Sequence, residues 1–149
     1  MPRSSDIDLH GAVRDASTRA LGAAGLGAIA LIHLLDLPGK FSETPYLAWM
    51  YIGLIISALV VAAEIVRSGA SRAWVAGAAL AAGALAGYTL TRTTGLPQAY
   101  GDVGNWTEPL GLASLFVEGV LVVLAAGVLA FRRTARGAAR PLRTALAGR

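Results

Sequence analysis

Four long runs of apolar residues, almost free of charge, constrain this chain more than any other feature. They lie at about residues 20–37, 46–66, 73–91 and 110–131. Each is close to the roughly 17–25 residues that a helix needs to cross the hydrocarbon core of a bilayer. Because unpaired backbone groups are costly in lipid, such runs form helices there. The sequence therefore predicts an all-α fold, a membrane-spanning antiparallel four-helix bundle.

The composition agrees with a membrane protein. Charged residues make up 15% of the chain and the mean hydropathy is +0.59, whereas ordinary soluble domains are roughly 25% charged. The chain has no cysteine, which excludes disulfides, thiolate metal sites and thiol chemistry. Acidic residues are mixed with arginines in the first 19 residues. This mixture argues against a secretory signal peptide.

The arginines predict how the helices are oriented. Eleven of the twelve lie in the arm 1–19, in the turn 67–72 or in the Arg-rich tail 132–149. The other two loops contain only Lys40 and Arg92 as basic residues. By the positive-inside rule, both termini are cytosolic. The frequent arginine, alanine and glycine are typical of a GC-rich bacterial genome, so we expect a multi-pass protein of the bacterial inner membrane.

Two segments bear on the binding partners of the chain. The basic tail attracts anionic lipid, and the same charges set the orientation of the helices. We therefore interpret the tail as a topology signal with lipid contacts and not as a nucleic-acid site. The third apolar run contains Gly83 and Gly87 in a GxxxG pattern. Small residues let helices approach closely, so we expect this helix at the centre of the bundle. The same surface suits a membrane protein partner or a second copy of the chain.

The two halves of the chain resemble each other. Residues 33–38 and 92–97 both place a polar residue five positions before a proline in a Leu-Pro pair, which predicts the end of a helix. Residues 43–47 and 107–111 both contain an acid followed by a proline, a combination that favours a helix start. We therefore expect two tandem helix–loop–helix repeats, with the first helix ending at Pro38. Coincidence is the alternative, because both matches are short.

Seven residues form a candidate ligand-binding pocket, because ionisable and amphipathic side chains near membrane depth usually face the bundle interior. They are His33, Asp36, Tyr88, Arg92, Trp106, Glu108 and Glu118. Asp36 shares a helix face with His33 and is placed to accept a hydrogen bond from it. Glu118 is a carboxylate well inside the fourth run, so it is either neutral or paired with His33, Arg92 or Tyr88. It forms the floor of the pocket or, alternatively, a structural hydrogen bond that fixes helix register.

The sequence contains no enzyme signature and indicates no cofactor. There is no His/Cys cluster, phosphate loop, nucleophile elbow or zinc-protease motif. His33 is the sole histidine near the bilayer, which excludes a bis-histidine haem. A metal site would have to combine that histidine with the carboxylates of this region: Asp36, Glu43, Asp102 and Glu108. That set would suit hard or borderline cations, but hard-cation sites often need no histidine. The histidine is therefore no evidence for a cation site, and we predict no metal site.

The segments HLLDLPGKFSETPYL and RTTGLP…GDVGNWTEPLGLASLFVE carry a resemblance to a family. Over residues 31–129 the chain resembles small, uncharacterised four-span integral membrane proteins that are common in actinobacteria. The resemblance implies the four-span topology. It implies no activity and no catalytic residues.

Together these patterns predict a binding or transport-type module with an outward-facing polar pocket. Its ligand would be a small molecule, a lipid headgroup or a cation. The alternative is a non-catalytic accessory subunit whose small-residue helix packs on a larger membrane complex. An enzyme that uses Glu118 as a general acid or base is the third possibility.

Overall fold

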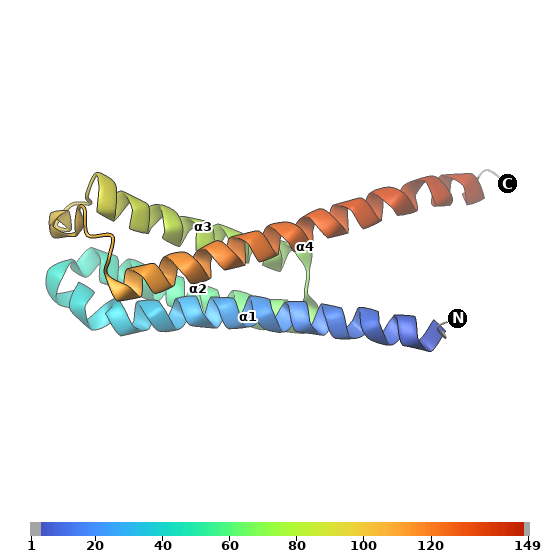
Figure 1. Ribbon diagram of the computed structural model, residues 1–149, viewed down its shortest axis with the longest axis horizontal. Coiled ribbons are helices and arrows are strands. Elements are labelled where there is room, and N and C mark those ends of the chain that lie inside the picture. The colour runs from blue at the N-terminus through green and yellow to red at the C-terminus, as the bar shows by residue number, and fades with distance from the viewer. Residues whose placement is uncertain (1–3, 148–149) are drawn as a thin grey trace.

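The computed structural model describes residues 4–147, with side chains described for residues 9–137, and confirms the all-α four-helix bundle. The four helices are α1 (Ser4–Glu43), α2 (Pro45–Ser68), α3 (Ser71–Thr93) and α4 (Pro109–Ala147). A single 3-10 turn, η1 (Tyr100–Asp102), lies in the connection between α3 and α4. The described residues contain no strand. Neighbouring helices run antiparallel, so both termini lie at the same end of the bundle (Figure 1).

All four helices are long and apolar enough to cross a membrane, so the four predicted spans are confirmed as membrane-spanning candidates. Two of the helices are much longer than a span. α1 has 40 residues and α4 has 39; at 1.5 Å per residue each is about 60 Å long, against a hydrocarbon core of about 30 Å. The arm 1–19 and the tail 132–149 are therefore not separated from the spans by a break, because the described parts of both continue the same helices (Figure 1).

The expected helix end at Pro38 is wrong. α1 continues through Pro38 to Glu43, although a proline inside a helix removes one backbone hydrogen bond. Contacts in the last turns compensate: the Ser42 hydroxyl donates to the Gly39 carbonyl at 2.8 Å, and the Lys40 ammonium lies 3.3 Å from the Glu43 carboxylate.

The helix instead ends at Glu43, and the next residue, Thr44, has a φ of −148°. Thr44 precedes Pro45, and a proline disfavours the helical conformation in the residue before it. The expected role of the later prolines is confirmed, since Pro45 and Pro109 are the first residues of α2 and α4.

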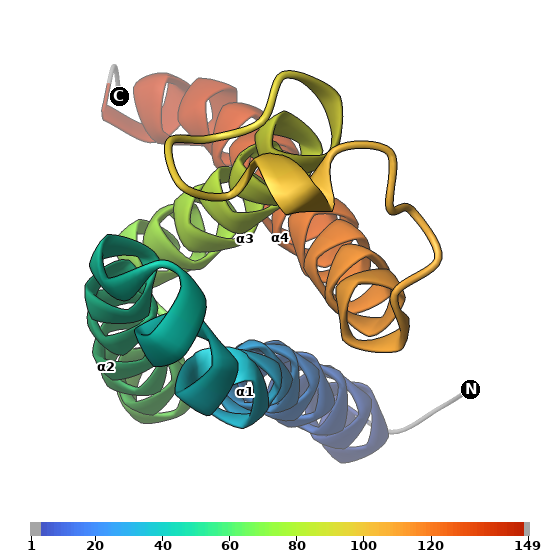
Figure 2. The same ribbon diagram turned by 90° about the vertical axis from the view of Figure 1, so that its left-hand side faces the viewer.

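The helices pack mainly as two pairs, α1 with α2 and α3 with α4. α2 and α3 lie close together at the turn that joins them and diverge toward the opposite end (Figure 2). The apolar core lies in the half of the bundle nearer that turn, and includes Leu26, Ile29, Ala58, Trp74, Ala81 and Leu121. The other half, in which α2 and α3 are apart, holds the polar residues described below.

The predicted close packing at Gly83 and Gly87 is also wrong, because no neighbouring atom lies within 4 Å of where a Cβ would stand at either position. Both lie in the half of α3 that ends at Thr93, and α3 diverges from α2 toward that end (Figure 2). Glycines of other helices make the tight approaches: a Cβ at Gly22 of α1 would lie 2.6 Å from the Trp74 ring, and one at Gly111 of α4 would lie even nearer to the Tyr88 ring. Small residues of α1 and α4, and not Gly83 or Gly87, therefore make the tight contacts with α3.

Candidate functional site

A cavity of about 490 Å³ lies in the half of the bundle away from the termini. Residues of all four helices and of the loop between α3 and α4 line it. Four of the seven predicted pocket residues are among them: His33, Asp36, Tyr88 and Arg92. The sequence therefore identified part of the wall of a real cavity, although nothing about the ligand follows from this alone.

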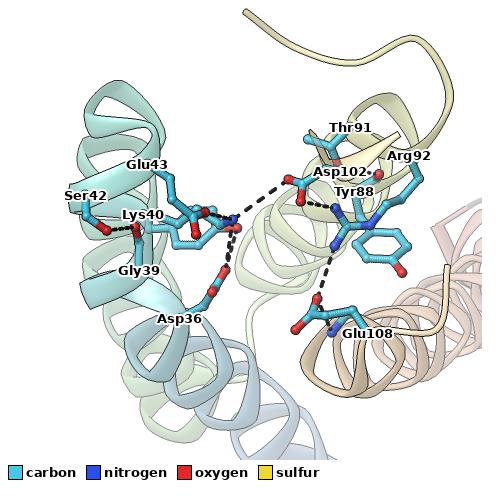
Figure 3. Close-up of polar contacts among 12 residues, drawn as sticks. Asp36, Gly39, Lys40, Ser42, Glu43, Tyr88, Thr91, Arg92, Asp102 and Glu108 are labelled. Carbon is cyan, nitrogen blue, oxygen red and sulfur yellow. Dashed lines mark hydrogen bonds and ion pairs between the residues drawn. The ribbon is translucent and has the colours of Figure 1, made fainter. Parts of the chain in front are cut away.

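Arg92 is the central charge of this site. It is only 6% exposed, and its guanidinium lies 2.9 Å from the Asp102 carboxylate and 3.1 Å from the Glu108 carboxylate (Figure 3). The Tyr88 ring lies beneath it, 4.8 Å from ring centre to guanidinium carbon. Glu108 also accepts a hydrogen bond from the Gly111 backbone amide at 3.2 Å. A buried cation is tolerated when its charge is paired in this way.

Lys40 connects this cluster to α1. Its ammonium lies 3.8 Å from the Asp102 carboxylate and 4.0 Å from the Asp36 carboxylate. Lys40 of α1 and Asp102 of the loop point toward each other across the cavity's end (Figure 3). The ion pairs thus run from Asp36 through Lys40, Asp102 and Arg92 to Glu108, and join the two helix pairs.

His33 makes contacts other than the expected one. Its Nδ1 donates to the Ile29 carbonyl at 2.9 Å, and its ring meets the Tyr51 ring edge-on with centroids 4.7 Å apart. Asp36 instead accepts a hydrogen bond from the Tyr51 hydroxyl at 3.3 Å. The predicted hydrogen bond between His33 and Asp36 is therefore wrong. Each group has a nearer partner, one a turn earlier on α1 and the other on α2.

Glu118 is fully buried but takes no part in the ion pairs. One carboxyl oxygen accepts a hydrogen bond from the Ser114 hydroxyl, and the other has no hydrogen-bond partner. Among the residues whose side chains are described, no Lys, Arg or His nitrogen lies within 4.0 Å of it. Of the two alternatives, pairing with His33 or Arg92 is wrong, and the Tyr88 hydroxyl also has no hydrogen-bond partner in the described part of the chain. Because an isolated ionised carboxylate would cost several kcal/mol at this depth, we expect the neutral acid.

Glu118 is also not the floor of the cavity. Ser114, one turn earlier on α4, lines the cavity, and Glu118 is not among the lining residues. The contact between the two lies within α4, so it does not fix the register of one helix against another, which was the alternative interpretation. Trp106 and Glu108 do not line the cavity either, but each contacts a residue that does. The Trp106 ring meets the Tyr88 ring edge-on with centroids 6.0 Å apart, and Glu108 pairs with Arg92.

Three ionisable residues that line the cavity were not among the seven predicted pocket residues: Lys40, Tyr51 and Asp102. A signal existed for the first. Lys40 lies four residues after Asp36, which is the spacing of an ion pair on one helix face, but this holds only if the helix continues past Pro38. No local pattern indicates that Tyr51 reaches Asp36 or that Asp102 reaches Arg92, because both contacts depend on how the helices and the loop pack.

The loop between α3 and α4 closes the end of the cavity. Its Leu96 and Asp102 line the cavity. The Tyr46 hydroxyl at the start of α2 donates to the Pro97 carbonyl at 2.8 Å, and the Gly104 amide donates to the Arg92 carbonyl at 3.0 Å. The loop is thus attached both to its own helix and to the opposite helix pair.

The acidic residues of the site are arranged around bases, not around a space for a cation. Within the part of the chain whose side chains are described, no group of three or more His, Cys, Asp or Glu side chains is placed to hold a metal ion. Asp36, Asp102 and Glu108 each pair with Lys40 or Arg92. The carboxylates considered as metal ligands are therefore engaged in ion pairs.

No protein-family model, curated protein or solved structure matches this chain. The function has to be argued from the site itself.

Proposed function

We propose that this protein is a membrane-embedded binding module, of the binding or transport type, whose cavity takes a small ligand, a lipid headgroup or a cation. The cavity carries the proposal: about 490 Å³ of space within a bundle of membrane-spanning length, with Arg92 buried at its wall. This volume falls within the roughly 300–1,000 Å³ of small-molecule sites. Ionisable side chains at membrane depth usually mark a binding site or a transport path.

We further propose that the cavity lies in the outer half of a bacterial inner membrane. The arginine distribution supports this orientation, because the turn between α2 and α3 and the terminal parts of α1 and α4 lie at the opposite end (Figure 1). We also propose that the chain is related to the four-span actinobacterial proteins and that its two helix pairs are repeats of each other. The repeat is supported by the matching positions of His33 and Arg92, one from each pair, on the cavity wall.

The orientation predicts opposite labelling of two introduced cysteines. Gly101→Cys, in the loop after α3, should react with a membrane-impermeant maleimide in intact cells. Gly137→Cys, in the terminal part of α4, should react only after the cells are permeabilised. Both glycines are exposed and neither has an atom within 4 Å of its Cβ position, so the substitutions are tolerated. The parent chain has no cysteine and is the unlabelled control. The reverse pattern would overturn the orientation.

Native mass spectrometry of the protein purified in mild detergent tests the binding function. We expect a non-covalently bound molecule that co-purifies with the unaltered chain and is lost from Gly83→Leu, in which a side chain enters the cavity. Gly83 lines the cavity and has no atom within 4 Å of its Cβ position. Gly119→Leu is the matched control, because Gly119 has the same free space but lies on α4 outside the cavity lining. Absence of any bound mass, or its retention in Gly83→Leu, would contradict the proposal.

A non-catalytic accessory subunit is the second candidate function. It is favoured by the small-residue face of α3, where Gly83 and Gly87 have no neighbouring atom within 4 Å. A helix of a partner protein packs closely against such a face. Purification without crosslinking distinguishes the two functions. A second protein in stoichiometric amount favours the subunit, whereas a monodisperse monomer or homodimer with a bound small molecule favours the binding module.

A further inference from the structure

We infer that the ligand is a neutral, hydroxyl-bearing amphiphile that reaches the cavity from the bilayer, between α2 and α3. The inference rests on the proposed binding function and specifies its ligand class. Three features carry it: the side on which the cavity opens, the balance of charge along its wall, and the hydrogen-bonding state of His33.

The polar end of the cavity is bounded by the loop between α3 and α4 and by ion pairs. The loop between α3 and α4 contributes Leu96 and Asp102 to the wall. Two contacts hold this loop against the other helix pair, the ion pair of Asp102 with Lys40 at 3.8 Å and the hydrogen bond from Tyr46 to the Pro97 carbonyl at 2.8 Å. Toward the termini the bundle is filled by the apolar core. Along the bundle axis a ligand would therefore meet ion pairs at one end of the cavity and the apolar core at the other.

The cavity is open sideways between α2 and α3. Met50 and Gly53 of α2, and Ala79 and Gly83 of α3, line the cavity and are also exposed on the outside of the bundle. A Cβ at Gly53 or Gly83 would meet no atom within 4 Å. The two helices diverge toward this end of the molecule (Figure 2). In a bilayer this opening faces the lipid acyl chains, so its natural entrant is a molecule already dissolved in the membrane.

The charges around the cavity offer no free site for an ionic headgroup. The charged lining residues are two acids, Asp36 and Asp102, and two bases, Lys40 and Arg92. They pair with one another at 2.9–4.0 Å. Glu108 adds one more negative charge behind Arg92. An anion would meet an excess of acid, and a cation would have to displace Lys40 or Arg92 from its partner. A neutral headgroup disturbs neither.

His33 provides a hydrogen-bond acceptor on this wall. Its Nδ1 lies 2.9 Å from the Ile29 carbonyl, which can only accept, so the proton is on Nδ1. In a neutral imidazole the other nitrogen, Nε2, is then an acceptor. His33 lines the cavity, and an acceptor there is matched by a ligand hydroxyl.

One end of the cavity is polar and the rest of its lining is mostly apolar, which matches the two parts of an amphiphile. The ion pairs of Lys40 and Arg92 mark its end at the loop, whereas Leu54, Leu80 and Ala84 line it nearer the middle of α2 and α3. The headgroup would therefore lie against the ion-paired end, with the apolar chain leaving between the two helices into the lipid.

Four probes test the ligand class on delipidated, detergent-solubilised protein by native mass-spectrometric titration. Monoolein is the neutral hydroxyl amphiphile. Oleoyl lysophosphatidic acid keeps its ester and chain but adds an anionic phosphate, and oleoylcholine replaces the hydroxyls with a cation. Monoacetin keeps the glycerol ester but lacks the chain. We expect monoolein to bind more tightly than each of the other three. Preference for a charged probe, equal binding of monoacetin, or no binding of monoolein would overturn the inference.

Variants establish that the bound monoolein occupies this cavity. Gly83→Leu should weaken its binding by roughly tenfold, because the side chain occupies the space of the ligand chain. Gly119→Leu should leave its binding unchanged. His33→Phe keeps an aromatic ring beside Tyr51 but removes the acceptor, and should weaken binding by about fivefold. Equal effects of the two leucine variants, or full monoolein affinity in His33→Phe, would refute the inference.

The two proposals fail in different ways. A co-purifying molecule that depends on Gly83, together with no binding of monoolein, would leave the binding function standing and refute the ligand class. Absence of any cavity-dependent ligand would refute both.

Discussion

Replacing Arg92 with leucine should lower the free energy of unfolding by about 3–5 kcal/mol, the usual result of breaking a buried ion pair by removing one partner. Arg92 is 6% exposed and pairs with Asp102 and Glu108, so its loss leaves Glu108 without a cation and leaves Asp102 with Lys40 alone. Chemical denaturation of the detergent-solubilised protein measures the change. Arg67→Leu is the control. Arg67 is paired with Glu64 but its side chain is 71% exposed, so its removal should have little effect.

Double-mutant cycles test whether Arg92 pairs with Glu108 or with Glu118. Glu108→Gln combined with Arg92→Leu should destabilise less than the sum of the single changes, because the two residues are in contact. Glu118→Gln combined with Arg92→Leu should be additive, since Glu118 bonds to Ser114 and lies outside the ion pairs. Coupling between Arg92 and Glu118 would contradict the arrangement described here.

Replacing Trp74 with alanine should have an effect of similar size, about 3–5 kcal/mol, because it leaves a large void in the core. Trp74 is 1% exposed and is among the largest fully buried side chains of the described residues. Its ring lies against Gly22 of α1, so its loss also removes a contact between the first and third helices. The midpoint of thermal or chemical unfolding in detergent measures the change.

Gly22 provides a complementary test of the same contact. Gly22→Val should destabilise because its Cβ would lie 2.6 Å from the Trp74 ring, and overpacking typically costs about 1–3 kcal/mol. Gly27→Val on the same helix is the matched control, since no atom lies within 4 Å of its Cβ position. Combining Gly22→Val with Trp74→Leu should recover part of the loss. Equal stability of the two valine variants would show that α1 and α3 are not in close contact.

The features predicted correctly from the sequence depend on local chemistry. The four helices follow from the length and hydropathy of the apolar runs, because lipid leaves the backbone no alternative. Pro45 and Pro109 begin α2 and α4 as expected, since proline suits the first helical turn. Pro38 shows the limit of such rules. α1 continues past this proline to Glu43. A proline inside a helix costs about 3 kcal/mol, but contacts elsewhere in the fold can offset that cost.

The features that the sequence did not predict depend on packing between elements. Arg92 was one of three candidate partners of Glu118, because both residues are ionisable and near the bundle interior. The nearer partners are Asp102 and Glu108, which the folding of the α3–α4 loop brings into contact. Gly83 and Gly87 carry a helix-packing pattern, yet α2 and α3 diverge at that level and leave them beside a cavity. A small-residue motif shows where close approach is possible, not which helix makes it.

The lengths of α1 and α4 have a mechanical consequence. Neither helix is interrupted between the cavity and the end of the bundle that carries the termini, so each extends beyond the cavity as a lever arm about 50 Å long. A tilt of about 10° at the cavity would displace the far end of such a rod by about 9 Å. The ends of α1 and α4 thus amplify any change of angle between the two helix pairs. The distance between two spectroscopic labels, one near each of these ends, therefore reports a change of angle between the two helix pairs.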